Sequence, residues 1–402
     1  MSNPFLGLIF HWLGGLASGS FYIPYRGVKK WAWETYWLVG GFFSWILTPI
    51  ILASLLTKDL PAVLGEASAE TLFWTYFFGV LWGTGGITFG LTMRYLGISL
   101  GVAVALGFCA AFGTLMPPIF KEMASHFSGS FAAYQGEFTV KVLQANSGLV
   151  ILLGVFVCFA GIGISGMAGM TKEKAMDEAQ KRVAIKEFDF KKGILVATFC
   201  GVMSACFSYA LEAGEPIKAL TLKHGTGELW QGLPVLVVVL LGGFTTNFIW
   251  CLFLNLRNGT AGQYFSAQVK TALPSSYPIL ETAIDAPGEE MAREARLSMK
   301  DSTRVPLGLN YLFCAVAGIT WYLQFFFYTM GESQMGQYKF SSWTLHMASI
   351  IIFSTLWGIA LKEWKGAGGR AMMWLVLSLA VLVGSTVIIG YGNYLGSIAS
   401  GH

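Results

Sequence analysis

Residues 171–192, TKEKAMDEAQKRVAIKEFDFKK, form the most highly charged run in an otherwise apolar chain. The run holds seven basic and five acidic residues, and so much charge is costly to place in the hydrocarbon of a bilayer. We therefore interpret it as a solvated linker with no chemistry of its own. Its position decides the fold, because it fixes how many apolar segments lie on each side.

The composition identifies an integral membrane protein. Hydrophobic residues make up 54% of the sequence and charged residues only 12%, about half the ~25% that is usual in soluble domains. All six cysteines fall inside apolar runs, which favours packing roles over a disulfide framework or a metal site. We expect no metal and no cofactor.

Ten apolar runs are long enough to cross the ~30 Å hydrocarbon core of a bilayer. They cover residues 5–24, 34–56, 72–91, 98–119, 147–168, 193–211, 230–256, 305–330, 342–361 and 371–392. Five runs precede the linker and five follow it. We therefore predict a first five-helix repeat at 1–170 and a second at 193–402, with an extended cytoplasmic loop at about 257–304.

An odd number of spans in each half means that the second half enters the membrane from the opposite side. The predicted fold class is thus an all-α integral membrane protein with ten transmembrane helices in two inverted five-helix repeats, a plan common among secondary transporters. A constant offset between the first and sixth spans pairs Gly7 with Gly193 and Gly15 with Gly201. In the second and seventh spans, residues 40–42 (GGF) likewise match residues 242–244 (GGF).

The loops differ in basic charge in a way that predicts topology. Alternate loops, the linker among them, carry twenty of the 26 Lys and Arg residues, and the other loops carry six. Basic residues are retained on the cytoplasmic side of a membrane. We therefore predict a cytoplasmic linker and both termini on the opposite side.

The motif content argues against an enzyme. The sequence has no P-loop, no His-Glu-x-x-His, no Gly-x-Ser-x-Gly and no clustered Cys/His spacing. Transport driven by a gradient, or facilitated passage, is what remains. No acidic residue lies in the middle of a span; those near span ends are Glu34, Glu212, Glu332 and Glu363.

Polar side chains inside the spans gather at one depth. At ~1.5 Å per residue, four of them lie roughly 6 to 14 Å below the outer surface: His11, Trp321, Gln324 and His346. Gln and Trp can bind a neutral sugar through an amide and a stacking face, and His titrates near neutral pH. The alternative role of each is a hydrogen bond to a neighbouring helix. Tyr22 and Asn247 are secondary candidates to line the path.

Three further patterns have packing or interfacial interpretations. Arg94 either reaches the inner headgroups or forms a gating ion pair with Glu34 or Glu363. A cluster at Trp31, Trp33 and Trp37 is typical of an interfacial aromatic belt. Four Gly-x-x-x-Gly pairs predict close helix contacts; they start at Gly15, Gly79, Gly86 and Gly97.

Several stretches resemble the L-rhamnose–proton symporter family of the drug/metabolite transporter superfamily. They are residues 21–22 (FY), 28–31 (VKKW), 33–35 (WET), 90–97 (GLTMRYLG), 322–328 (YLQFFFY), 343 with 345–347 (W, LHM) and 361–364 (LKEW). The resemblance implies ten helices, a bacterial inner-membrane location and uptake of a deoxy sugar with protons; the side predicted from the basic residues then places both termini in the periplasm. The implied partners are a sugar, protons and membrane lipids, without nucleic acid.

The resemblance and the residues together predict proton-coupled uptake of L-rhamnose or a closely related 6-deoxy sugar. The candidate sugar-binding residues are Trp321, Gln324, Tyr328, His346, His11, Tyr22 and Asn247. His346, Glu34 and Glu212 compete as the proton carrier. Two alternatives remain open: an uncoupled drug/metabolite exporter or facilitator, and a membrane sugar sensor that signals through its long loop.

Overall fold

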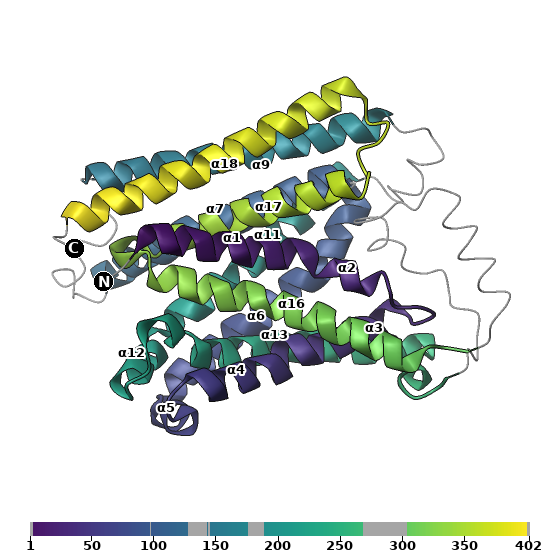
Figure 1. The fold of residues 1–402 in the computed structure, drawn as a ribbon, viewed down its shortest axis with the longest axis horizontal. Coiled ribbons are helices and arrows are strands. Elements are labelled where there is room, and N and C mark those ends of the chain that lie inside the picture. Colours follow the sequence, from purple (N-terminus) through teal and green to yellow (C-terminus); the bar gives the residue numbers. More distant parts are fainter. Residues whose placement is uncertain are drawn as a thin grey trace.

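The computed structural model describes residues 3–96, 98–127, 143, 145–175, 189–267 and 304–399, without the side chains of 93, 94, 98–100 and 120–127. Within these residues the regular elements are helices, so the predicted all-α class is confirmed for this part of the chain. The long helices form one bundle, and the two chain termini lie at the same end of it (Figure 1).

The long helices follow the predicted spans closely. In the first half they are α1 (Pro4–Ser20), α3 (Trp33–Phe42) with its continuation α4 (Thr48–Leu56), α6 (Ala69–Leu96), α7 (Ile98–Phe127) and α9 (Asn146–Ala175). In the second half they are α11 (Phe190–Ala213), α13 (Leu233–Asn258), α16 (Leu307–Ser333), α17 (Ser341–Ala360) and α18 (Gly368–Ala399).

Shorter elements connect the long ones. A π-helical segment, η1 (Phe43–Leu47), joins α3 to α4. The others are α2 (Tyr22–Tyr25), α5 (Leu60–Glu66), α12 (Glu215–Lys223), and the 3₁₀ turns η3 (Glu228–Trp230), η4 (Ala261–Tyr264) and η5 (Gly336–Tyr338).

Nine helical segments of the described residues are long and apolar enough to cross a membrane. The remaining predicted span, 72–91, lies in α6, which is 28 residues long but contains many Gly, Thr, Trp and Tyr residues, which lower its mean hydropathy. The chain is therefore a multi-pass membrane protein.

Both predicted loops fall largely outside the described residues. Within the linker, residues 171–175 end α9, and residues 190–192 begin α11. Asp189 caps α11 by accepting a hydrogen bond from the backbone N–H of Lys192 (3.1 Å). This bond lowers the pKa of the Asp189 carboxyl. Residues 176–188 and 268–303 are not described, so the predicted division of the chain stays a prediction.

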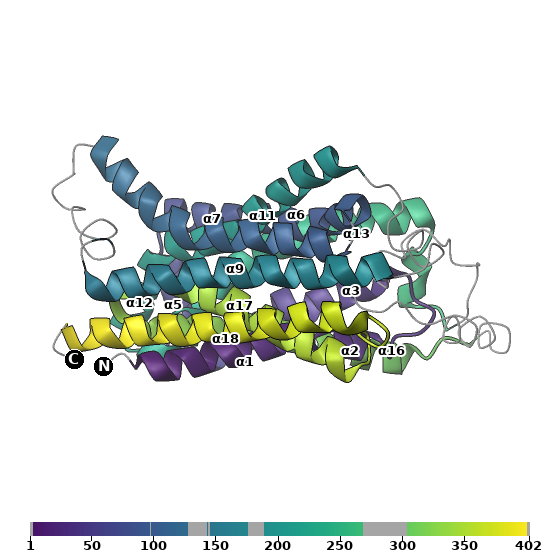
Figure 2. The same cartoon turned by 90° about the horizontal axis from the view of Figure 1, so that it is seen from above.

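Packing joins helices from the two halves of the chain. Helix α1 packs against α16 and α17, α11 packs against α6 and α7, and α9 lies along α18 (Figures 1 and 2). Lipid tails supply little hydrophobic drive for helix association, so close van der Waals contact at small residues matters most.

The glycine pairs test this expectation one by one. A Cβ added at Gly15 would overlap Ser349 of α17, and one at Gly79 would overlap the carbonyl oxygen of Val239 on α13. At Gly86 and Gly90, in contrast, no other part of the described chain lies within 4 Å of such a Cβ. Within these residues the predicted packing surface is therefore confirmed at the first two pairs and wrong at Gly86-x-x-x-Gly90. The pair that starts at Gly97 falls on a residue outside those described.

The predicted aromatic belt is wrong for Trp31. Its side chain is buried and meets Tyr311 edge-on, with ring centroids 5.0 Å apart. The cause is the loop before α3, which folds against α16: the backbone of Lys29 both donates to and accepts from the Asn310 side chain (3.0 and 2.8 Å).

We expect Gly79→Ala to lower the free energy of unfolding by roughly 1–3 kcal/mol, because the added methyl overpacks the contact of α6 with α13. The matched control Gly86→Ala should leave it unchanged or raise it by up to ~1 kcal/mol, as helix propensity favours Ala. Denaturant unfolding of both variants in detergent micelles measures the difference. Equal effects would contradict the assigned contact.

Candidate functional site

The π-helical segment η1 shapes the centre of the bundle. It carries Ser44 and Trp45, both buried, and π segments inside helices are frequent at functional sites. Two glycines precede it. A Cβ on Gly40 would overlap the hydroxyl of Tyr25, and one on Gly41 would lie 2.6 Å from the Trp45 ring. The glycines thus let two aromatic side chains reach the backbone of α3.

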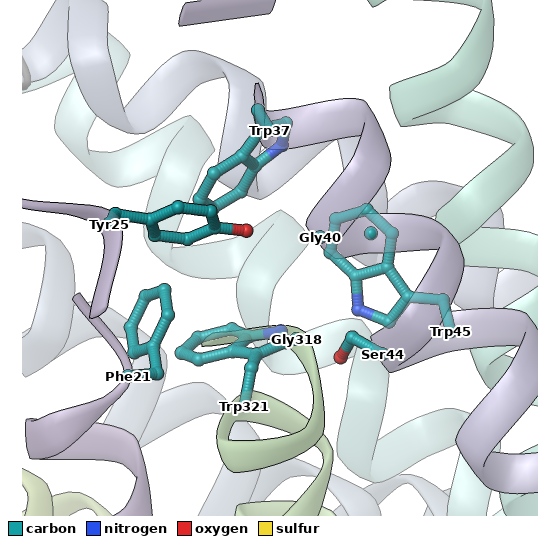
Figure 3. Close-up of a pocket in the computed structure, with 9 residues that line it drawn as sticks. Phe21, Tyr25, Trp37, Gly40, Ser44, Trp45, Gly318 and Trp321 are labelled. Atoms are coloured by element: carbon teal, nitrogen blue, oxygen red, sulfur yellow. The ribbon is translucent and has the colours of Figure 1, made fainter. Parts of the chain in front are cut away.

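An aromatic cavity lies against η1. Its walls, drawn in Figure 3, are Phe21, Tyr25, Trp37, Gly40, Gly41, Ser44, Trp45, Gly318 and Trp321. The rings of Phe21 and Trp321 are in contact, with centroids 4.1 Å apart. The free space is about 10 Å³, room for one water molecule. A sugar can enter only if these rings move apart.

Three hydrogen-bond donors of this cavity have no partner among the described residues: Ser44 Oγ, Trp45 Nε1 and Trp321 Nε1. In Figure 3 the indole nitrogen of Trp321 is directed toward the side where Ser44 and Trp45 lie. A buried donor without an acceptor costs about 1–3 kcal/mol. The cavity therefore combines stacking faces with donors that a ligand rich in oxygen would satisfy.

A second group of polar side chains, the histidine cluster, comprises His11, Gln324, Tyr328 and His346. All four are buried. The ring centroids are 5.4 Å apart for His11 and Tyr328, 5.2 Å for Tyr328 and His346, and 6.4 Å for His11 and His346. Gly14 makes the approach possible, since its Cβ would lie 3.0 Å from the Gln324 carbonyl oxygen.

The histidine cluster also holds unpartnered polar atoms. Within the described residues, both ring nitrogens of His11, Nδ1 of His346 and Nε2 of Gln324 have no hydrogen-bond partner. The structure thus brings three members of the predicted polar layer together. The fourth, Trp321, lies about one turn before Gln324 on α16 and belongs to the aromatic cavity instead.

An aromatic column separates the two groups. Phe325 lies between them on α16 and contacts Phe207 (centroids 4.7 Å apart) and Trp82 (5.4 Å). Trp343 stacks on Phe207 at 5.9 Å and meets Tyr328 at 5.8 Å. The path from the histidine cluster to the aromatic cavity is filled by rings in this conformation.

Two secondary candidates flank the aromatic cavity. Tyr22 packs on Phe21 with ring centroids 3.8 Å apart, and Asn247 Oδ1 accepts from Trp37 Nε1 (3.1 Å). Trp37 is therefore a wall of the cavity and not a member of an interfacial belt. Its spacing to Gly41 and Ser44 on one helix face was the signal in the sequence that could have identified this wall.

The remaining predicted residues lie apart from these groups. Glu212 sits in the last turn of α11, half-buried. Glu363 follows α17, with Oε2 3.0 Å from where a Cβ on Gly358 would lie. Arg94 lies in α6, and its side chain is outside the described residues, as is its predicted ion pair. The Glu34 carboxylate instead accepts hydrogen bonds from Asn258 and Thr260 (2.9 and 2.8 Å).

The sequence reasoning assigned no role to a buried ion pair at the other end of α16. Lys218 Nζ lies 2.6 Å from Glu332 and 2.8 Å from Glu215, and the lysine is only 3% exposed. The pair fastens α12 to the end of α16 beside Gly331, which contacts His11. The i,i+3 spacing of Glu215 and Lys218 was its sequence signal.

The chain is similar to known proteins over nearly its whole length. A family model described as "L-rhamnose-proton symport protein" matches residues 1–284 and 290–395. A curated protein of Salmonella gallinarum, named L-rhamnose-proton symporter, is 35% identical over 394 residues, which cover 98% of this chain and 99% of that protein. Proteins of the same name from Salmonella paratyphi B and Salmonella newport are 34% identical over the same share of each chain.

We expect Lys218→Met to lower the free energy of unfolding by roughly 2–4 kcal/mol, because it leaves Glu332, which is only 12% exposed, without its cation, while Glu215 keeps Lys339 (3.7 Å). Lys223→Met is the matched control on the same helix. It removes an exposed contact with Glu66 (3.5 Å) and should change stability by less than about 1 kcal/mol. Equilibrium unfolding in micelles compares the two; a loss no larger than the control's would show that the buried pair does not hold α12.

Proposed function

Because the chain belongs to the L-rhamnose-proton symport protein family, we propose that it is a secondary active transporter that takes up L-rhamnose with protons across a bacterial inner membrane. The observation that carries the assignment of a site is the aromatic cavity with its three unpartnered donors. The family match favours symport over an uncoupled exporter or a sugar sensor.

The chemistry of the aromatic cavity suits a 6-deoxy sugar. Such a sugar presents an apolar face and a methyl group, which the rings of Trp321, Trp37 and Phe21 can cover. Its hydroxyl oxygens can accept from Ser44, Trp45 and Trp321. We propose that the rings part to admit the sugar and that Trp321 contacts it directly. Tyr22 and Asn247 act indirectly, because Tyr22 holds Phe21 in place and Asn247 holds Trp37.

The histidine cluster serves as the outer part of the path in this proposal. Its buried His11, Gln324, Tyr328 and His346 offer polar atoms to a sugar before it passes the aromatic column. His346, Glu34 and Glu212 remain the candidates for the proton. The catalytic chemistry of an enzyme is not part of this function, since transport needs binding and conformational change alone.

The packing of glycines supports two inverted repeats of five helices. In this arrangement α6, the third long helix of the chain, crosses the membrane in addition to the nine apolar segments, which makes ten crossings. In this scheme α1, α3, α6, α7 and α9 correspond to α11, α13, α16, α17 and α18. The contacts follow the correspondence: α1 meets α16 and α17, while α11 meets the counterparts α6 and α7. Both termini at one end of the bundle also fit an even number of crossings (Figure 1).

Matched glycines meet matched helices. A Cβ on Gly15 would touch Ser349 of α17, and one on its counterpart Gly201 would touch Phe108 of α7. Gly7 likewise faces the end of α16 and Gly193 the end of α6. These contacts favour a join between repeats within residues 171–192. The distribution of basic residues separately favours a cytoplasmic linker and both termini in the periplasm.

The proposed function is tested by uptake of radiolabelled L-rhamnose into proteoliposomes. With an inwardly directed proton gradient we expect accumulation at least ~10-fold above the level reached after a protonophore is added, since a gradient of one pH unit supplies a tenfold ratio per proton. Equal levels with and without the gradient would identify a facilitator and rule out symport.

For Ser44→Ala we expect KM for L-rhamnose to rise about 5- to 10-fold, the effect of one lost hydrogen bond. Stability should not fall, because the Ser44 hydroxyl has no partner within the described protein. Ser378→Ala is the control, since that buried hydroxyl bonds the Leu375 carbonyl of its own helix α18. Initial uptake rates give KM; an unchanged value for Ser44→Ala would remove this residue from the sugar site.

A further inference from the structure

Glu34 is a buried carboxylate that links the two halves of the chain. It lies in the first turn of α3 and is only 2% exposed. Its Oε1 accepts from Asn258 Nδ2 (2.9 Å) and from Thr260 Oγ1 (2.8 Å). Both donors are neutral, and no basic side chain among the described residues pairs with it. Burying a carboxylate is costly unless hydrogen bonds compensate it, and here the bonds from the end of α13 provide that compensation.

The end of α13 is built to present these donors. Gly259 ends the helix with φ +66°, a left-handed conformation that glycine adopts without strain. The turn directs Thr260 back toward the helix, where its N–H donates to the Asn255 carbonyl (3.0 Å). Thr260 Oγ1 also lies 3.0 Å from Asn255 Oδ1, so its one hydroxyl proton has two alternative acceptors, Glu34 and Asn255.

Thr35 extends the same network. Its hydroxyl lies 3.0 Å from Gln263 Oε1 and 3.4 Å from Asn255 Oδ1, and Gln263 Oε1 also accepts from the backbone N–H of Ala32 (2.7 Å). We call this network the inner latch; its members are Glu34, Thr35, Asn255, Asn258, Thr260 and Gln263. It holds α3 of the first half against α13 and η4 of the second.

The inner latch lies on the route from the aromatic cavity. Glu34, Trp37 and Gly41 follow one another at spacings of three and four residues, so they share a face of α3. Trp37 and Gly41 line the cavity. The start of α3 lies at the end of the bundle opposite the two termini (Figure 1). A movement of α3 that opens the cavity in that direction and carries α3 away from the end of α13 would break the latch.

The other titratable groups near Glu34 do not supply a compensating charge. Cys251 on α13 and Tyr264 on η4 face it, and burial raises the pKa of the Tyr264 hydroxyl, which stays neutral near pH 7. Tyr264 is bonded to Asn255 (2.9 Å) and accepts at its carbonyl from the Tyr311 hydroxyl of α16 (2.8 Å).

The basic groups nearby are directed elsewhere or exposed. Lys30 Nζ donates to the Arg304 carbonyl (3.3 Å), while Arg26, Lys29 and Arg257 are exposed. On α6 the side chain of Arg94 lies outside the described residues. A change of charge within the described latch therefore comes from Glu34 itself.

Resting on the proposed symport function, we propose that Glu34 carries the coupled proton and that the inner latch is the gate it controls. Hydrogen bonds to an ionised carboxylate are roughly twice as strong as those to a neutral acceptor. The ionised latch stays closed. A proton that enters from the outside through the opened cavity neutralises Glu34, weakens both bonds and lets α3 leave α13.

In the proposed transport cycle, the number of protons bound equals the number released. With the gate open, Glu34 releases its proton to the cytoplasm together with the sugar, and the carboxylate accepts from Asn258 and Thr260 again. One proton is bound and one released for each passage. Because the gate opens in the protonated form, sugar without a proton is not released inward.

Glu34→Gln tests the proposal, since Gln mimics the neutral acid. In proteoliposomes we expect the variant to catalyse rhamnose counterflow but to lose accumulation driven by the proton gradient, by at least ~10-fold. Glu66→Gln is the matched control, because Glu66 is an exposed partner of Lys223 and His224 and should accumulate normally. Accumulation by Glu34→Gln equal to that of the unaltered protein would overturn the proposal.

A second variant decides the case if Glu34→Gln does not fold. Thr260→Val keeps the carboxyl but removes a donor that favours its ionised form, so half-maximal uptake should move to higher pH by about 0.5–1 unit. Thr320→Val, whose hydroxyl bonds its own helix at Val316, should not move it. An unshifted pH profile in Thr260→Val would contradict the latch. If the unaltered protein ignores the gradient, the symport function fails instead.

Discussion

Close backbone contact between the two halves is the constraint on which this structure depends. In lipid, helices gain little from burying apolar surface against each other, so they must fit. Glycines at positions 15, 79 and 201 provide that fit, each meeting a helix of the other half without room for a methyl group. Hydrogen bonds accompany these contacts, such as Ser349 to the His11 carbonyl beside Gly15 and Thr246 to the Val80 carbonyl beside Gly79. The polar latch at Glu34 adds to them at the end of α3.

The second constraint is that polar groups deep in the bundle must find partners. Most do: Thr114 bonds Thr344, and the Ser349 hydroxyl bonds the His11 carbonyl. Among the described residues, the exceptions include three donors of the aromatic cavity and four nitrogens of the histidine cluster, while others, such as Thr57 and Thr75, lie elsewhere. The two groups are therefore places where several open polar atoms lie close together, and the aromatic column stands between them.

Much of the fold was predictable because span length and composition are properties of the sequence alone. The residues that form the wall of the aromatic cavity could not be predicted in this way. Trp31 and Trp37 look alike beside a span, but one packs on α16 and the other lines the cavity, because the preceding loop folds inward. Gly79 and Gly86 carry the same motif on different faces of α6, and only a neighbour distinguishes them. Nothing in the sequence around Ser44 identifies the π segment that places its side chain inside the bundle. The hydrogen-bond partners of Glu34 lie more than 200 residues away in the sequence, so no local pattern could identify them.

The aromatic column has a consequence for the energy balance of the cell. Hydronium crosses a membrane protein readily along a continuous wire of water molecules, and a carrier that contained one would dissipate the membrane potential between transport events. The rings of Phe207, Phe325, Trp82 and Trp343 contact one another and leave such a wire little volume, and the Trp343 indole N–H is already donated to the Cys109 carbonyl (3.0 Å). The same rings that must part for a sugar therefore also oppose a water wire in this conformation.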